Sequence, residues 1–97
     1  MNYYEMWQPK IDEVMDNFDF ERVHRVMTFL DWKWHSSEMS VPTIPDMRVQ
    51  VRRLIRDAIN LYATGRDATI GTGGFSVTVD GGIHVQFILD EWYAHEG

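Results

Sequence analysis

The stretch that decides the fold is TIGTGGFSVTVDGGIHVQFILDEW, residues 69–92, which holds five glycines and two runs of alternating apolar residues. Alternation with a period of two is typical of half-buried strands. A three-residue loop at Asp80–Gly82 places Phe75 opposite Phe87 and leaves one face of the hairpin entirely apolar. A two-residue loop would mix apolar and polar residues on both faces. The sequence therefore predicts the three-residue register.

The glycine-rich segment GTGG, residues 71–74, precedes the first of these alternating runs. The same register, continued backwards, pairs Ile70 with Trp92 and puts the glycines midway along one long strand arm. Glycine inside a strand marks a bulge, a bend or a close backbone approach. A phosphate-binding loop would be followed by a helix, whereas a strand follows here. We expect a bend, with a backbone that contacts a ligand at Gly73 and Gly74 as the alternative.

The clearest helix signal in the chain is the motif TIPD, residues 43–46. Thr43 is suited to cap the helix, and Pro45 lies in the first turn, where a missing N–H costs nothing. Gly65 is a natural C-terminal cap. The apolar face predicted for this helix consists of Met47, Val51, Leu54, Ile55, Ala58, Leu61 and Tyr62.

Two further helices are predicted closer to the N-terminus. Residues 8–16 offer a short helix with Pro9 in its first turn. Residues 19–32 offer a helix capped by Asp19. Its apolar stripe consists of Phe20, Val23, Val26, Met27 and Leu30. After it, Trp32 and Trp34 alternate with charged residues, which is typical of a short extended segment.

These elements predict an α+β fold in which two or three helices pack on one face of a small antiparallel sheet built around the C-terminal hairpin. The 97 residues suffice for a single domain. Within it we distinguish an N-terminal extension or short helix at 1–17, a helical part at 18–66 and the hairpin at 67–94.

Composition and charge argue against several classes of function. The net charge of −6 argues against general DNA binding, and no apolar run could span a membrane. The absence of cysteine excludes thiolate metal sites and disulfides. The four histidines lack metal-ligand spacing, and no serine lies in a nucleophile motif. We therefore expect no enzyme activity, no catalytic residues, no metal and no cofactor.

Arginine and tryptophan provide the candidate binding residues. Five of the nine basic residues lie in 41–66, and four of them form a ridge on the third helix: Arg48, Arg52, Arg53 and Arg56. Such a ridge can bind phosphates or a partner's carboxylates in bidentate fashion. Alternatively, it is a solvated face that pairs with Asp46 and Asp57 or with the acidic termini. Trp32 and Trp34 are candidates for an interface, with filling of the core as the alternative.

Three segments together resemble a group of short bacteriophage proteins: FERVHRVMTFLDWKW, VPTIPDMR and TGGFSV with VQFILDEW. The resemblance covers residues 18–92. It implies a protein of the host bacterial cytoplasm that inhibits an antiviral defence system, as anti-CRISPR proteins do, by stoichiometric binding to a host defence protein or complex. The alternatives are a sponge that sequesters a nucleotide immune signal and a host-takeover accessory protein. A homodimer is compatible with each of these roles.

Overall fold

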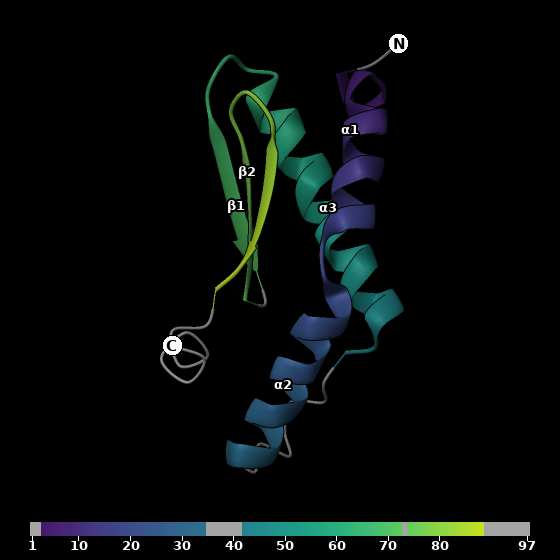
Figure 1. Cartoon of the computed structure of the whole chain (residues 1–97). Coiled ribbons are helices and arrows are strands. Elements are labelled where there is room, and N and C mark those ends of the chain that lie inside the picture. Colours follow the sequence, from purple (N-terminus) through teal and green to yellow (C-terminus); the bar gives the residue numbers. More distant parts are fainter. Residues whose placement is uncertain (1–2, 35–41, 73, 89–97) are drawn as a thin grey trace.

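The computed structural model describes residues 3–34, 42–72 and 74–88, with residues 30–34 described by their backbone alone. In these residues, the elements are α1 (Tyr3–Asn17), α2 (Phe20–Trp34), α3 (Ile44–Tyr62), β1 (Ala68–Thr72), β2 (Phe75–Val79) and β3 (Ile83–Phe87). Helices α1 and α3 pack on one face of a three-stranded antiparallel sheet of order β1-β2-β3, and α2 packs against α3 and extends beyond one end of the sheet (Figure 1). The predicted α+β class, with the strands at the C-terminal end, is confirmed.

Helix α3 is the centre of the fold and contacts α1, α2, β1 and β2. Its predicted start is confirmed, because the Oγ1 atom of Thr43 accepts a hydrogen bond from the N–H of Asp46 at 3.3 Å. Gly65, at φ +89°, follows its end and donates its N–H to the carbonyl of Tyr62 at 2.9 Å. One predicted core position is wrong: Leu61 is 52% exposed, whereas Ile59 is completely buried. The buried side of α3 includes Ile59 rather than Leu61, because α3 packs beside α1 as well as on the sheet.

Helix α1 is longer than predicted, and it runs beside α3 in the opposite direction (Figure 1). It begins at Tyr3, so that Pro9 lies in its interior rather than in its first turn. An interior proline removes one backbone hydrogen bond and costs about 3 kcal/mol relative to alanine. Burial of Ile11 and Met15 against the rest of the core offsets this cost.

Helix α2 begins where it was predicted, because Oδ1 of Asp19 accepts the N–H of Arg22 at 2.9 Å. Phe20, Val23 and Val26 of its predicted stripe are buried. The extended segment predicted at Trp32 and Trp34 is wrong, since the backbone remains helical through Trp34. The region from Phe20 to Trp34 contains no glycine or proline that would end the helix earlier.

Strands β2 and β3 pair in the predicted register, with Phe75 opposite Phe87 and Val79 opposite Ile83. The loop between them has the predicted three residues. A glycine suits the left-handed position of a three-residue loop, but neither Gly81 nor Gly82 has a positive φ. Instead, the carboxylate of Asp80 accepts the N–H groups of both glycines.

The bend predicted at GTGG is wrong, because the chain reverses there completely. Thr72 pairs with Phe75 and Ile70 pairs with Val77, so that the chain changes direction between Thr72 and Phe75 and begins a new strand. Gly74 has φ +90°, a conformation in which only glycine avoids strain. Folding back gives β2 a second strand partner, and this adds a complete ladder of backbone hydrogen bonds to the sheet. The predicted partner Trp92 lies outside the described residues.

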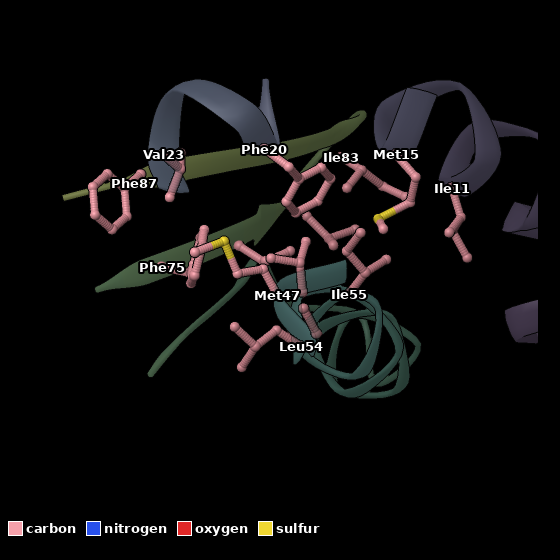
Figure 2. Packing of buried hydrophobic residues seen from close by; sticks show 14 of the residues in the cluster. Ile11, Met15, Phe20, Val23, Met47, Leu54, Ile55, Phe75, Ile83 and Phe87 are labelled. Atoms are coloured by element: carbon pink, nitrogen blue, oxygen red, sulfur yellow. The ribbon is translucent and has the colours of Figure 1, made fainter. Parts of the chain in front are cut away.

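The apolar core lies between the sheet and the helices (Figure 2). Phe75 is 1% exposed, and its ring centroid lies 5.3 Å from that of Phe87 and 6.1 Å from that of Phe18. The opposite face of the sheet carries small or polar residues: Thr69, Gly71, Ser76, Thr78, His84 and Gln86. Hydrophobic burial therefore stabilises one face only.

Candidate functional site

The arginine ridge is divided into two parts by the fold. Arg48 lies over the ring of the buried Phe20, with its guanidinium carbon 5.0 Å from the ring centroid. Arg52 forms an ion pair with Asp12, with Nη2 3.4 Å from Oδ1. These two arginines therefore join α3 to α2 and to α1. The sequence allows the ridge either to bind a partner or to pair with acidic residues of the chain itself. Arg52 pairs with an acidic residue of the N-terminal segment.

Arg53 and Arg56 form the other part of the ridge, which we call the cationic pair. Both are exposed, and neither forms an ion pair with an acidic residue in the described part of the chain. They lie one turn apart on α3, together with Val49, whose side chain is 51% exposed. This surface offers two guanidinium groups and an apolar side chain to a partner.

A cluster of aromatic rings lies where the start of α1 meets the end of α3. Tyr3, Trp7 and Tyr62 have ring centroids 5.9–6.4 Å apart, and Trp7 meets Tyr62 edge-on. Met6, one turn after Tyr3, is 63% exposed, and Tyr3 is 36% exposed. We call these four residues the aromatic patch. Large apolar side chains gathered in this way at a surface are typical of interfaces.

The sequence only partly indicated the aromatic patch. The apolar spacing places Tyr62 on the buried face of the third helix, and no periodic pattern singles out Met6. A helix that begins at Tyr3 brings Tyr3 and Trp7 onto one face, because they are four residues apart. This spacing is visible in the sequence, but the helix predicted at 8–16, with Pro9 in its first turn, leaves out Tyr3 and Trp7.

The glycine segment is part of the sheet. Gly71 pairs with Ser76, and the carbonyl of Gly74 accepts the N–H of Ile88 at 2.7 Å. The φ of Gly74 favours glycine, and a β-carbon there would lie 3.1 Å from Cε2 of Phe87, so the ring would have to shift by a few tenths of an ångström. The backbone of Gly74 is thus engaged within the fold. Gly73 lies outside the described residues.

The remaining candidates give no further site. The side chains of Trp32 and Trp34 lie outside the described residues, although both belong to the backbone of α2. No group of three or more histidine, cysteine or acidic side chains that could hold a metal occurs in the described residues. His24 is half-buried, and His84 is exposed.

Asp80 has a perturbed acidity. The N–H of Gly81 donates to its carboxylate at 2.6 Å, and this hydrogen bond is the main reason that the pKa of Asp80 lies below its ordinary value. Desolvation opposes the shift, while the N–H of Gly82 and the nearby His84 lower the pKa further. Nε2 of His84 lies 3.4 Å from Oδ1 of Asp80. These contacts hold the loop between β2 and β3 in place, and they do not point to a catalytic role for Asp80.

Comparison with known proteins adds no family. No family model matches the chain, and neither a curated protein nor a solved structure matches it. In the part of the chain that the structure describes, no helix is long and apolar enough to cross a membrane.

Proposed function

We propose that this chain is a protein-binding module that inhibits a bacterial antiviral defence system in the host cytoplasm, and that its aromatic patch is the anchor of the interaction. The observation that carries the proposal is the contact of Tyr3, Trp7 and Tyr62 beside the exposed Met6. Tryptophan and tyrosine supply much of the binding energy in protein interfaces. Methionine adapts to irregular partner surfaces.

The cationic pair supports a partner with acidic groups. Arg53 and Arg56 are exposed on α3, and a guanidinium group can bind a carboxylate in bidentate fashion. The chain as a whole carries a net charge of −6, which disfavours nucleic acid as the partner. The cationic pair therefore fits individual carboxylates on the surface of a defence protein, which Arg53 and Arg56 would contact at short range.

The nucleotide sponge receives less support from the geometry. It required Arg48, Arg52 and Arg56 to act together with the backbone of the glycine segment. Arg48 instead covers Phe20, and Arg52 pairs with Asp12. The carbonyl of Gly74 accepts a backbone hydrogen bond. Only part of the proposed phosphate site is left available.

Plating efficiency tests the proposal. The protein is expressed in bacterial strains that each carry one defence system, and each strain is challenged with a sensitive phage. We expect plaques to be restored in one strain. Failure to restore plaques across a broad panel would contradict the inhibitor role and favour the host-takeover alternative.

Variants then test the two surfaces separately. We expect Met6→Glu to abolish the restoration of plaques, whereas Ile88→Glu leaves it unchanged, because Ile88 is 44% exposed but lies outside the aromatic patch. We expect Arg53→Glu with Arg56→Glu to weaken restoration. The matched control replaces Arg25 and Arg66, two other exposed arginines, with glutamate, and so changes the net charge equally. An equal loss in both double variants would show that net charge matters rather than the cationic pair.

A further inference from the structure

Strand β1 forms an edge of the sheet. The strand order is β1-β2-β3, so β1 is hydrogen-bonded to β2 on one side only. Helix α1 packs beside β3 at the other edge, while β1 lies on the side of the sheet away from α1 (Figure 1). Within the described residues, no strand pairs with the outer side of β1.

The outward-pointing backbone groups of β1 follow from the hydrogen bonds. The N–H of Ile88 donates to the carbonyl of Gly74, so Gly74 points toward β3. Because backbone groups alternate along a strand, Phe75 and Val77 point the other way, toward β1. Their partners in β1 therefore point inward, among them Ile70 opposite Val77.

The two residues that flank Ile70 consequently present their backbone to solvent. Thr69 and Gly71 each offer one N–H and one C=O at the open edge. The side chain of Ile70 is half-buried and lies on the apolar face of the sheet. A strand added at this edge would satisfy the backbone groups and cover the side chain.

The strand itself lacks the devices by which proteins prevent edge pairing. Natural edge strands commonly carry lysine, proline, an inward charge or a bulge. Strand β1, with the sequence ATIGT, has no charge and no proline, and its pairing with β2 runs without interruption over five residue pairs. Such an edge is suited to strand addition.

We propose that β1 pairs antiparallel with β1 of a second copy of this chain, which gives a dimer with a continuous six-stranded sheet. A two-fold axis beside Ile70 places Thr69 opposite the second copy's Gly71, so the four outward groups of each strand are all paired. Ile70 then meets Ile70 of the second copy on the apolar face. Both helical layers lie on the same side of the joined sheet.

The neutral seam permits a second copy as the occupant, and the register selects it, because the outward groups of β1 pair completely with those of an identical strand. Two chains of net charge −6 repel each other, and they associate best through a neutral surface. Strand β1 is neutral along its whole length. In this register, Arg66 lies opposite the second copy's Gly74 and not opposite the same arginine. Self-pairing therefore brings no like charges together along the seam.

Proline substitution tests the interface, with mass measured by light scattering over a concentration series. We expect the wild type to reach twice the monomer mass of 11.4 kDa. Thr69→Pro removes an N–H that points outward, so it leaves the bonds to β2 intact and abolishes the dimer. Thr69→Ala keeps that N–H and stays dimeric, although both variants lose the hydroxyl contact with Thr78. A monomeric wild type, or a dimeric Thr69→Pro that retains the wild-type circular dichroism, would overturn the proposal.

A second test uses the lack of cysteine in the chain, since each single-cysteine variant then carries one thiol. Directly opposite residues in a non-hydrogen-bonded pair have close side chains. We expect Ile70→Cys to form a disulfide-linked dimer under mild oxidation. Thr78→Cys, on the central strand, stays monomeric on a denaturing gel. Equal crosslinking of both variants would contradict the register. Light scattering and crosslinking report assembly independently of inhibition, which plating reports.

Discussion

Arg52 and Asp12 join the first and third helices through an ion pair, with Nη2 of the arginine 3.4 Å from Oδ1 of the aspartate. The two residues are 40 positions apart in the sequence, so the pair is a tertiary contact. Both side chains are about half exposed, at 43% and 54%. Solvent screening at this exposure limits what the pair contributes to stability.

Charge reversal at this pair measures its contribution. We expect Arg52→Glu to lower the free energy of unfolding by about 0.5–1 kcal/mol, as for other exposed ion pairs. Adding Asp12→Arg to the same chain restores part of the loss, because the pair re-forms with its charges exchanged. Urea unfolding of the two single variants and the double variant gives the coupling free energy. A coupling of zero would show that the ion pair does not form in solution.

The glycines with positive φ allow a second prediction. Gly65→Ala costs about 1–2 kcal/mol, because Gly65 has φ +89° and open space around it. Gly74→Ala costs more, since its β-carbon also lies 3.1 Å from Cε2 of Phe87. Thermal unfolding of both variants separates the backbone strain from the side-chain clash. Equal destabilisation would mean that the ring of Phe87 moves aside freely.

Proline in α1 provides a stabilising substitution. Pro9 is exposed and lies inside the helix, where it lacks an N–H to donate. We expect Pro9→Ala to raise the free energy of unfolding by about 1–3 kcal/mol. Gln50→Ala, an exposed position inside α3, is the control and changes stability by only a few tenths. Denaturant midpoints measure both. No gain from Pro9→Ala would indicate that α1 does not pass through this position as a helix.

The loop at Asp80 predicts a dependence on pH. The pKa of this carboxyl lies below its ordinary value of 3.8 in the folded protein, so its ionised form stabilises the fold. That stabilisation is fully present above 3.8 and is lost as the pH falls through the lower, folded pKa.

Comparison of Asp80→Ala with the wild type tests whether this stabilisation is lost at low pH. We expect Asp80→Ala to lower the Tm at about pH 7 and to have a smaller effect at about pH 2.5. Asp80→Asn keeps an oxygen that accepts the N–H of Gly81 but cannot ionise, so its Tm relative to Asp80→Ala should not vary with pH. A constant difference between the wild type and Asp80→Ala across this range would contradict a lowered pKa.

Local signals determined the parts of the fold that could be predicted. The cap at Thr43 located α3, because capping is set by residues close together in sequence. The β2–β3 register followed from the requirement that one face be apolar. The reversal between β1 and β2 is not apparent from the sequence, because β1 alone shows little alternation and only its pairing with β2 reveals it as a separate strand.

Tertiary contacts explain why the candidate site was predicted only in part. Spacing places Arg48, Arg52 and Arg56 on one ridge. It cannot show that Asp12 pairs with Arg52 or that Arg48 lies over the ring of Phe20. In the same way, Tyr62 follows the apolar spacing of α3. Its place in a surface cluster depends on where α1 begins, because its ring partners are Tyr3 and Trp7.

Binding of the purified protein to the component of the defence system that plating identifies tests the central claim most directly. In isothermal titration calorimetry, we expect saturable binding at a fixed stoichiometry, weakened about tenfold or more by Met6→Glu. We expect Ile88→Glu to bind like the wild type. Absence of binding, or equal affinity for wild type and Met6→Glu, would contradict the claim that this chain acts by binding a protein through its aromatic patch.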